Sequence, residues 1–112
     1  MTPEDFRRIA LDLPEATENS HQGHPDFRVR GKIFATLGWP DAGWAMVKLT
    51  PEQQELLTRA EPQIFAPVPG TWGQRGSTNM RLVRADSATT RSALTMAWRN
   101  IAPKSVVDRC GR

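Results

Sequence analysis

The chain has few of the residues that build disulfides, metal cages or membrane spans. Among its 112 residues are one cysteine, two histidines and no tyrosine. Cys110, being single, forms neither an internal disulfide nor a cysteine metal cage. No segment approaches the roughly 18 consecutive apolar residues of a membrane span. The N-terminus MTPEDFRR carries acids where a secretory signal carries bases, so we expect a cytoplasmic protein with no membrane partner.

The length and the charge distribution set the next limits. A chain of this size typically forms one domain, which we expect to span residues 1–106, with a flexible tail at 107–112 and loose chain from Lys104. Residues 1–61 carry 7 basic and 10 acidic side chains, whereas residues 62–112 carry 8 basic and 2 acidic ones. A basic half that faces one way favours phosphate or another polyanion. Alternatively, the two halves interleave in space and the asymmetry averages out.

Apolar periodicity and turn residues divide the chain into short elements. Thr2-Pro3 and Thr50-Pro51 each pair an N-cap with a proline at the first helical position. Helices are expected over residues 3–12, 51–60 and from Asp86 or Ser87 to about 101, and strands near 16–21, 26–30, 32–38, 44–49, 64–66 and 79–84. The side chains expected to be buried are Phe27, Val29, Leu49, Leu56, Leu94 and Trp98.

The order of these elements indicates the fold class. Short turns between neighbouring strands favour an antiparallel sheet, and the one-sided apolar stripes of the helices favour packing on a single face of it. We therefore expect an α+β fold, a two-layer sandwich with helices covering one face of an antiparallel sheet.

Three separated segments, taken together, carry a family resemblance. They are Ser20 with GHPDFRVRGKIFA at 23–35, Leu56-Leu57 with Ala60-Glu61-Pro62, and Ala97-Trp98-Arg99 with Ala102-Pro103. In this order and spacing they resemble the MmcQ/YjbR family of small bacterial proteins, over most of residues 4–106. The resemblance implies a fold similar to CyaY, the bacterial frataxin. Such proteins are usually labelled DNA-binding, and the family brings no agreed catalytic residues to transfer.

A basic hairpin is the first candidate site. If residues 26–30 are extended, Phe27 and Val29 point to the core while Arg28 and Arg30 point the other way. Arginine suits phosphate geometry, and a β-ribbon fits a major groove. The candidate nucleic-acid-binding residues are Arg28, Arg30, Lys32, Trp72, Arg75 and Arg81. The alternative is an ordinary solvated strand face.

The loop around Trp72 is the second candidate. Gly70 and Gly73 flank this tryptophan, so it either moves to stack on a base or close over a ligand, or folds back onto the sheet. His21 and His24, even with Glu18, lack the pattern of a metal site. Acids suited to weak iron binding in frataxin-like proteins are interrupted here by Arg7 and Arg8.

We thus expect a non-enzymatic binding module without cofactor or metal. Its expected partner is DNA, bound weakly and in a salt-sensitive way through the hairpin and the arginines of the second half. The alternative is a protein- or small-molecule-binding module that uses the sheet face and the Trp72 loop. Salt separates the two, because phosphate contacts weaken steeply as salt rises.

Overall fold

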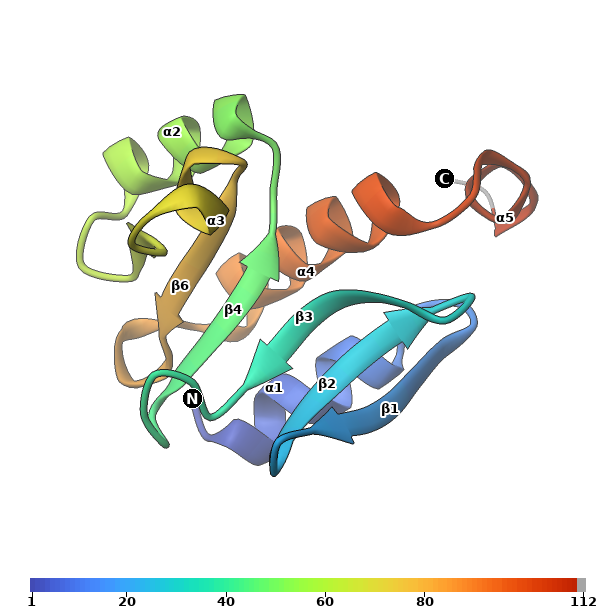
Figure 1. The fold of residues 1–112 in the computed structure, drawn as a ribbon, viewed down its shortest axis with the longest axis horizontal. Coiled ribbons are helices and arrows are strands. Elements are labelled where there is room, and N and C mark those ends of the chain that lie inside the picture. The colour runs from blue at the N-terminus through green and yellow to red at the C-terminus, as the bar shows by residue number, and fades with distance from the viewer. Residues whose placement is uncertain (111–112) are drawn as a thin grey trace.

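The computed structural model describes residues 1–110 and places six strands in one antiparallel sheet (Figure 1). The strands lie in the order β1-β2-β3-β4-β6-β5. Their bounds are β1 (Ala16–His21), β2 (His24–Val29), β3 (Lys32–Leu37), β4 (Trp44–Lys48), β5 (Phe65–Pro67) and β6 (Ser77–Arg81). Consecutive strands pair through short turns from β1 to β4, and β6 then inserts between β4 and β5.

Helices α1 and α4 lie on one side of the sheet. Figure 1 shows α1 and α4 behind the strands, and α3 on the opposite side near β6. The helices are α1 (Pro3–Leu11), α2 (Pro51–Ala60), α3 (Thr71–Gln74), α4 (Ser87–Ile101) and α5 (Lys104–Cys110), with a 3₁₀ turn at Leu82–Arg84. None of the helices within residues 1–110 has the length and apolar character needed to span a bilayer. The predicted α+β fold with an antiparallel sheet is confirmed.

Side-chain caps begin the three longest of these helices. The hydroxyls of Thr2 and Thr50 each accept a hydrogen bond from the backbone N–H three residues on, and the side-chain oxygens of Asp5 and Gln53 accept one from the backbone N–H of the cap residue. Asp86 accepts from the Thr89 amide at 2.7 Å and begins α4. These contacts satisfy amides that the first helical turn leaves without partners.

The core lies between the sheet and helices α1 and α4. Phe6 of α1 meets Phe27 of β2 edge-on at a ring separation of 6.0 Å. Trp98 of α4 is 4% exposed, and its Nε1 donates to the Pro14 carbonyl oxygen at 2.9 Å. That hydrogen bond satisfies the one polar atom of a large buried ring. Trp98 therefore joins α4 to the segment between α1 and β1.

A bulge in β3 changes which side chains face the core. Phe27 pairs with Ala35 but Arg28 pairs with Ile33, so β3 has one extra residue, Phe34, at this point. Phe34 and Ala35 are both fully buried. The bulge shifts Ile33 to the side opposite the core, where simple alternation would not place it.

The structure corrects three expectations. Leu56 is 59% exposed, because α2 packs at the β5–β6 edge and only Leu57 reaches the core. The strand predicted at 79–84 ends at Arg81 and continues as a 3₁₀ turn. From Lys104 the chain forms α5 rather than loose chain, since Val106 is fully buried. Residues 111–112 of the predicted tail lie outside the described residues, and the domain limits stay a prediction.

Replacing Trp98 with alanine should lower the free energy of unfolding by about 3–5 kcal/mol, the usual cost of removing a large aromatic ring from a core. Urea unfolding followed by circular dichroism measures this. Leu56→Ala is the matched control, because truncating an exposed side chain typically changes stability by less than about 0.5 kcal/mol. Equal stability of the Trp98→Ala protein and the parent would contradict the packing described here.

Candidate functional site

The sheet face away from α1 and α4 is here called the open face. Strand register and alternation assign a set of mostly polar side chains to it, with Trp44 and the apolar Ile33 and Met46 among them. They are Thr17, Asn19, His21, His24, Asp26, Arg28, Ile33, Thr36, Trp44, Met46, Lys48, Ser77, Asn79 and Arg81. The short helix α3 lies on this side near β6, contrary to the expectation that helices cover a single face, and the rest of the open face is available to a ligand.

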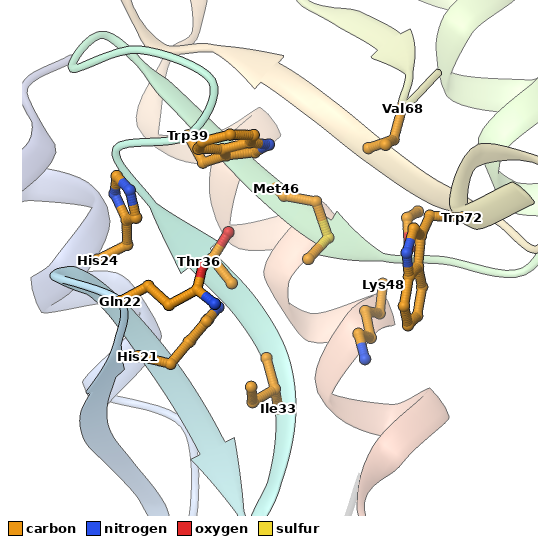
Figure 2. Close-up of a pocket in the computed structure, with 11 residues that line it drawn as sticks. His21, Gln22, His24, Ile33, Thr36, Trp39, Met46, Lys48, Val68 and Trp72 are labelled. Atoms are coloured by element: carbon orange, nitrogen blue, oxygen red, sulfur yellow. The ribbon is translucent and has the colours of Figure 1, made fainter. Parts of the chain in front are cut away.

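A pocket of about 500 Å³ lies on the open face (Figure 2). Ile33, Thr36, Met46 and Lys48 from β3 and β4 line it, with His21, Gln22 and His24 from the β1–β2 turn on one side. Trp39 of the β3–β4 loop and, from the β5–β6 connection and β6, Val68, Trp72 and Ser77 complete the lining. Its size is within the usual range for small-molecule sites.

Two tryptophans stand on different sides of Met46 at the rim of this pocket (Figure 2). Trp39 is 56% exposed and meets the His24 ring edge-on at 5.5 Å. Trp72 is 61% exposed, and the Lys48 ammonium lies 5.6 Å from its ring centroid. Exposed indoles in a concavity offer flat apolar surface to a ligand.

Local backbone constraints position Trp72. Gly70 has a φ of 82°, and a Cβ on Gly73 would lie 1.6 Å from the Val68 carbonyl oxygen. Gln54 of α2 donates to the Gly73 and Ser77 carbonyl oxygens at 2.9 and 3.0 Å, which ties α2 to both ends of this turn. The predicted Trp72 loop is therefore a short helix pressed against its own chain, with the indole at the pocket rim.

Next to the pocket, Asp26 has no exposed side-chain surface and accepts three hydrogen bonds. Arg28 donates from Nε and Nη2 at 2.8 and 3.1 Å, and His21 Nδ1 lies 2.7 Å from Oδ2. The Arg28 hydrogen bonds hold the pKa of Asp26 below its usual value, against the opposing effect of burial, and His21 adds to the lowering. An ionised carboxylate only accepts, so His21 carries its proton on Nδ1 and leaves Nε2 free when neutral.

The basic hairpin does not form one cationic face. Strand β2 ends at Val29, and Arg30 and Gly31 form a two-residue turn with φ values of 52° and 81°. Arg28 is paired with Asp26, and Arg30 Nε is 2.6 Å from Glu15 Oε1. Lys32 pairs across the ladder with Val29, in phase with the core face. Arg30 therefore lies in the turn and not on the strand with Arg28, contrary to the strand expected at 26–30, and the binding of both residues to nucleic acid stays a prediction.

The candidate nucleic-acid-binding arginines of the second half of the chain, Arg75 and Arg81, are more available to a ligand than those of the hairpin. Arg81 lies on the open face with its guanidinium 4.7 Å from the Trp44 ring centroid, and Arg75 is exposed at the end of α3. With Lys48 and Trp72, the open face therefore holds two cation–indole pairs. The candidates expected from the sequence do not include three residues that line the pocket, Trp39, Met46 and Lys48. For Met46 and Lys48 the sequence does contain a signal. The alternation of Ala45, Val47 and Leu49 on the core face places Met46 and Lys48 on the opposite face.

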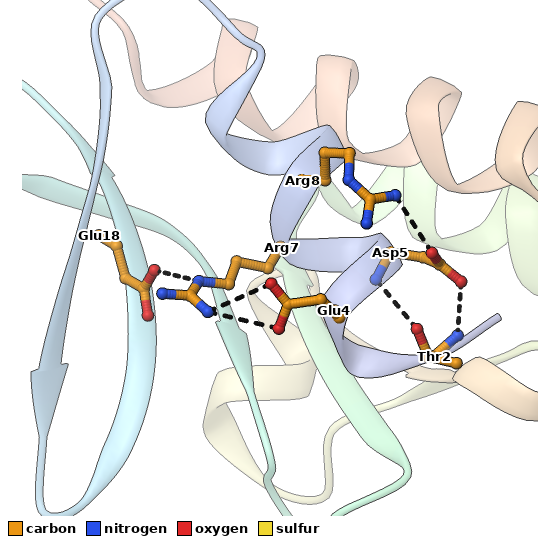
Figure 3. Close-up of polar contacts among 6 residues, drawn as sticks. All are labelled: Thr2, Glu4, Asp5, Arg7, Arg8 and Glu18. Atoms are coloured by element: carbon orange, nitrogen blue, oxygen red, sulfur yellow. Dashed lines mark hydrogen bonds and ion pairs between the residues drawn. The ribbon is translucent and has the colours of Figure 1, made fainter.

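The acidic side chains near α1 also form ion pairs with arginines (Figure 3). Arg7 pairs with Glu4 and Glu18, and Arg8 pairs with Asp5. Farther along, Asp12 pairs with Arg91, while Arg30 and Arg109 both contact Glu15. Within residues 1–110, no group of three or more metal-ligating side chains gathers in a way that could hold an ion.

The comparisons with known proteins agree with this architecture. The YjbR family model matches residues 11–100. The chain belongs to the YjbR family. A crystal structure of the Deinococcus radiodurans protein DR2400, with a domain of the family model DUF419, superposes with a TM-score of 0.76 at 19% identity, covering 96% of this chain and 83% of that one. This likeness supports the fold. A search of curated proteins finds no match.

Replacing Asp26 with asparagine should cost about 2 kcal/mol at neutral pH, because the hydrogen bonds from Arg28 and His21 lose their charged acceptor. The folded pKa of Asp26 lies below its unfolded value of 3.8, so its stabilising effect is present above that value and is lost as pH falls further. The stability gap between parent and variant should therefore narrow below about pH 4.

Urea unfolding at a series of pH values measures that gap. Taking the difference between parent and variant removes the contribution of other carboxylates with lowered pKa values, Asp5, Glu15 and Asp86. Asp41→Asn, in an exposed turn, is the matched control. A gap that stays constant down to about pH 2 would show that the Asp26 cluster does not stabilise the fold through its charge.

Proposed function

We propose that this protein is a non-enzymatic binding module whose ligand site is the pocket on the open face. The observation that carries this proposal is the pair of exposed tryptophans at the rim of a single concavity. An indole side chain presents on the order of 150–250 Å² of surface to burial, so covering two of them provides a large driving force for binding. In Figure 2 both rings border the space above Met46.

Several features support a preformed site. Trp39 is held by its edge contact with His24, and Trp72 by the packing of Gly73 on Val68 and by Gln54. Beneath them, β3 and β4 are paired strands, so the base of the pocket is rigid. A rigid site loses little conformational entropy when it binds, which favours affinity from a modest contact area.

The absence of catalysis belongs to the same proposal. The hydroxyl side chains that line the pocket are Thr36 and Ser77. Within residues 1–110, no serine or threonine hydroxyl hydrogen-bonds to His21 or His24. A nucleophile activated by an adjacent base requires that contact. The histidines therefore act in this proposal as polar walls of the pocket.

A screen of small aromatic fragments should shift the indole Nε1–H resonances of Trp39 and Trp72 in two-dimensional NMR spectra, because those rings border the pocket. The Trp98 indole is the internal control, since its hydrogen bond to Pro14 lies in the core. Trp39→Ala and Trp72→Ala should each weaken the binding of fragments that shift both resonances. If no fragment perturbs either indole, this proposal fails.

Nucleic acid is a second candidate ligand, favoured by the two cation–indole pairs on the open face. Single strands bind where bases stack on aromatic rings and cations meet phosphates. Arg28 and Arg30 contribute less in this version than the sequence suggests, because a carboxylate beside each of them repels phosphate. Arg75 and Arg81 have no carboxylate within ion-pair distance among the described residues.

Changing Arg75 and Arg81 together to glutamine should therefore reduce the salt dependence of binding to single-stranded DNA. Each lost phosphate contact removes about 0.7 from the slope of log affinity against log salt, so the double variant should lose about 1.4. The double variant Arg28→Gln/Arg30→Gln is the matched control, and it should change the slope less than the Arg75/Arg81 variant does. No binding by the parent at about 50 mM salt would eliminate this candidate.

A further inference from the structure

The charge of the pocket lining has one sign. Among the residues that the structure describes, Lys48 is the only lysine or arginine that lines the pocket, and no aspartate or glutamate does. Lys48 has no carboxylate within ion-pair distance in the part of the chain that the structure describes. Its ammonium lies over the Trp72 ring instead. A half-buried cation that has only an aromatic ring as partner can still gain a strong contact from an anion.

The acid on the nearby β2 strand does not cancel this charge. Asp26 is fully buried, and its carboxylate is hydrogen-bonded to both Arg28 and His21. Arg28 neutralises it at 2.8 Å, so the pair contributes little net field at the pocket. His21 and His24 line the same pocket and bring no negative charge to it. The lining is therefore neutral to cationic throughout.

The shape of the remaining lining indicates the rest of the ligand. Met46 and Ile33 form apolar floor, while the flat faces of Trp39 and Trp72 rise on different sides of it (Figure 2). Thioether and indole groups pack well against aromatic rings. A flat ring over Met46 leaves a substituent on the Trp72 side within reach of the Lys48 ammonium.

Building on the proposed pocket function, we propose that the ligand is a small flat aromatic or heteroaromatic anion. Its ring lies between the two tryptophans over Met46, and its carboxylate or phosphate binds the Lys48 ammonium. A volume of about 500 Å³ accommodates such a molecule of one or two fused rings with its charged group.

Three naphthalene probes test the proposal: 2-naphthoate, 2-naphthyl phosphate and neutral 2-naphthamide. Titrations followed by the four indole NMR resonances give their affinities. At least one anion should bind about tenfold more tightly than the amide, as expected for a hydrogen bond between charged groups. The tighter anion identifies the carboxylate or the phosphate as the preferred group. Shifts should concentrate on Trp39 and Trp72 and leave Trp98 unchanged.

Lys48→Met should remove the preference for the anion and preserve binding of the amide, because methionine keeps the apolar stem. Lys104→Met, at an exposed lysine that begins α5, is the matched control and should keep the preference. Circular dichroism verifies folding, and Lys48→Gln replaces Lys48→Met if that variant unfolds.

The outcomes separate this inference from the function on which it rests. Equal binding of all three probes at Trp39 and Trp72 would leave the pocket function intact and overturn the anion preference. An anion preference that survives in the Lys48 variants would also overturn it. Failure of every probe and every fragment to shift these two indoles would instead overturn the pocket function itself.

Discussion

The one-sided burial of the sheet under α1 and α4 is the constraint on which the rest of the structure depends. Phe6, Phe27 and Trp98 bring the apolar groups of three segments into a single layer. This layer buries apolar side chains of β2, β3, β4 and β6, and it leaves the other side of the sheet without a covering helix over most of its area. On the open face the buried carboxylate of Asp26 accepts hydrogen bonds from neighbouring side chains of the same face, Arg28 and His21.

Elements whose cause is local could be predicted from the sequence. The caps at Thr2, Thr50 and Asp86 act within one helical turn, so the residues that make them are adjacent in the chain. The apolar seam of α4 through Leu94 and Trp98 is likewise a property of its own spacing. The exposure of Leu56 and the formation of α5 could not be predicted in this way, because burial at these positions depends on residues that are far away in the sequence. The position of α2 at a short edge strand exposes Leu56, whereas Val106 of α5 is buried as part of the main apolar core.

The candidate site was less predictable for the same physical reason. The exposure of Trp72 could be suspected from the glycines around it, but its partner Lys48 is 24 residues away and meets it only through the sheet. The sequence shows the arginines of the hairpin, but it does not show which acids pair with them. Glu15 precedes β1 and reaches Arg30 across the β1–β2 ladder, and Asp26 meets Arg28 because residues two apart on a strand share a face.

The two ligand classes proposed for the open face differ in how far they must extend. Lys48 with Trp72 borders the pocket, whereas Arg81 with Trp44 lies at the other end of the β4–β6 ladder. Trp44 and Lys48 are four residues apart on one strand, so the two pairs are separated by about 13 Å along it. A small aromatic anion bound over Met46 does not extend as far as Trp44. A nucleic-acid strand needs both pairs, because one stacked base and one phosphate provide too little affinity alone. Trp44 is therefore the residue whose contact with ligand distinguishes a pocket from a nucleic-acid-binding surface.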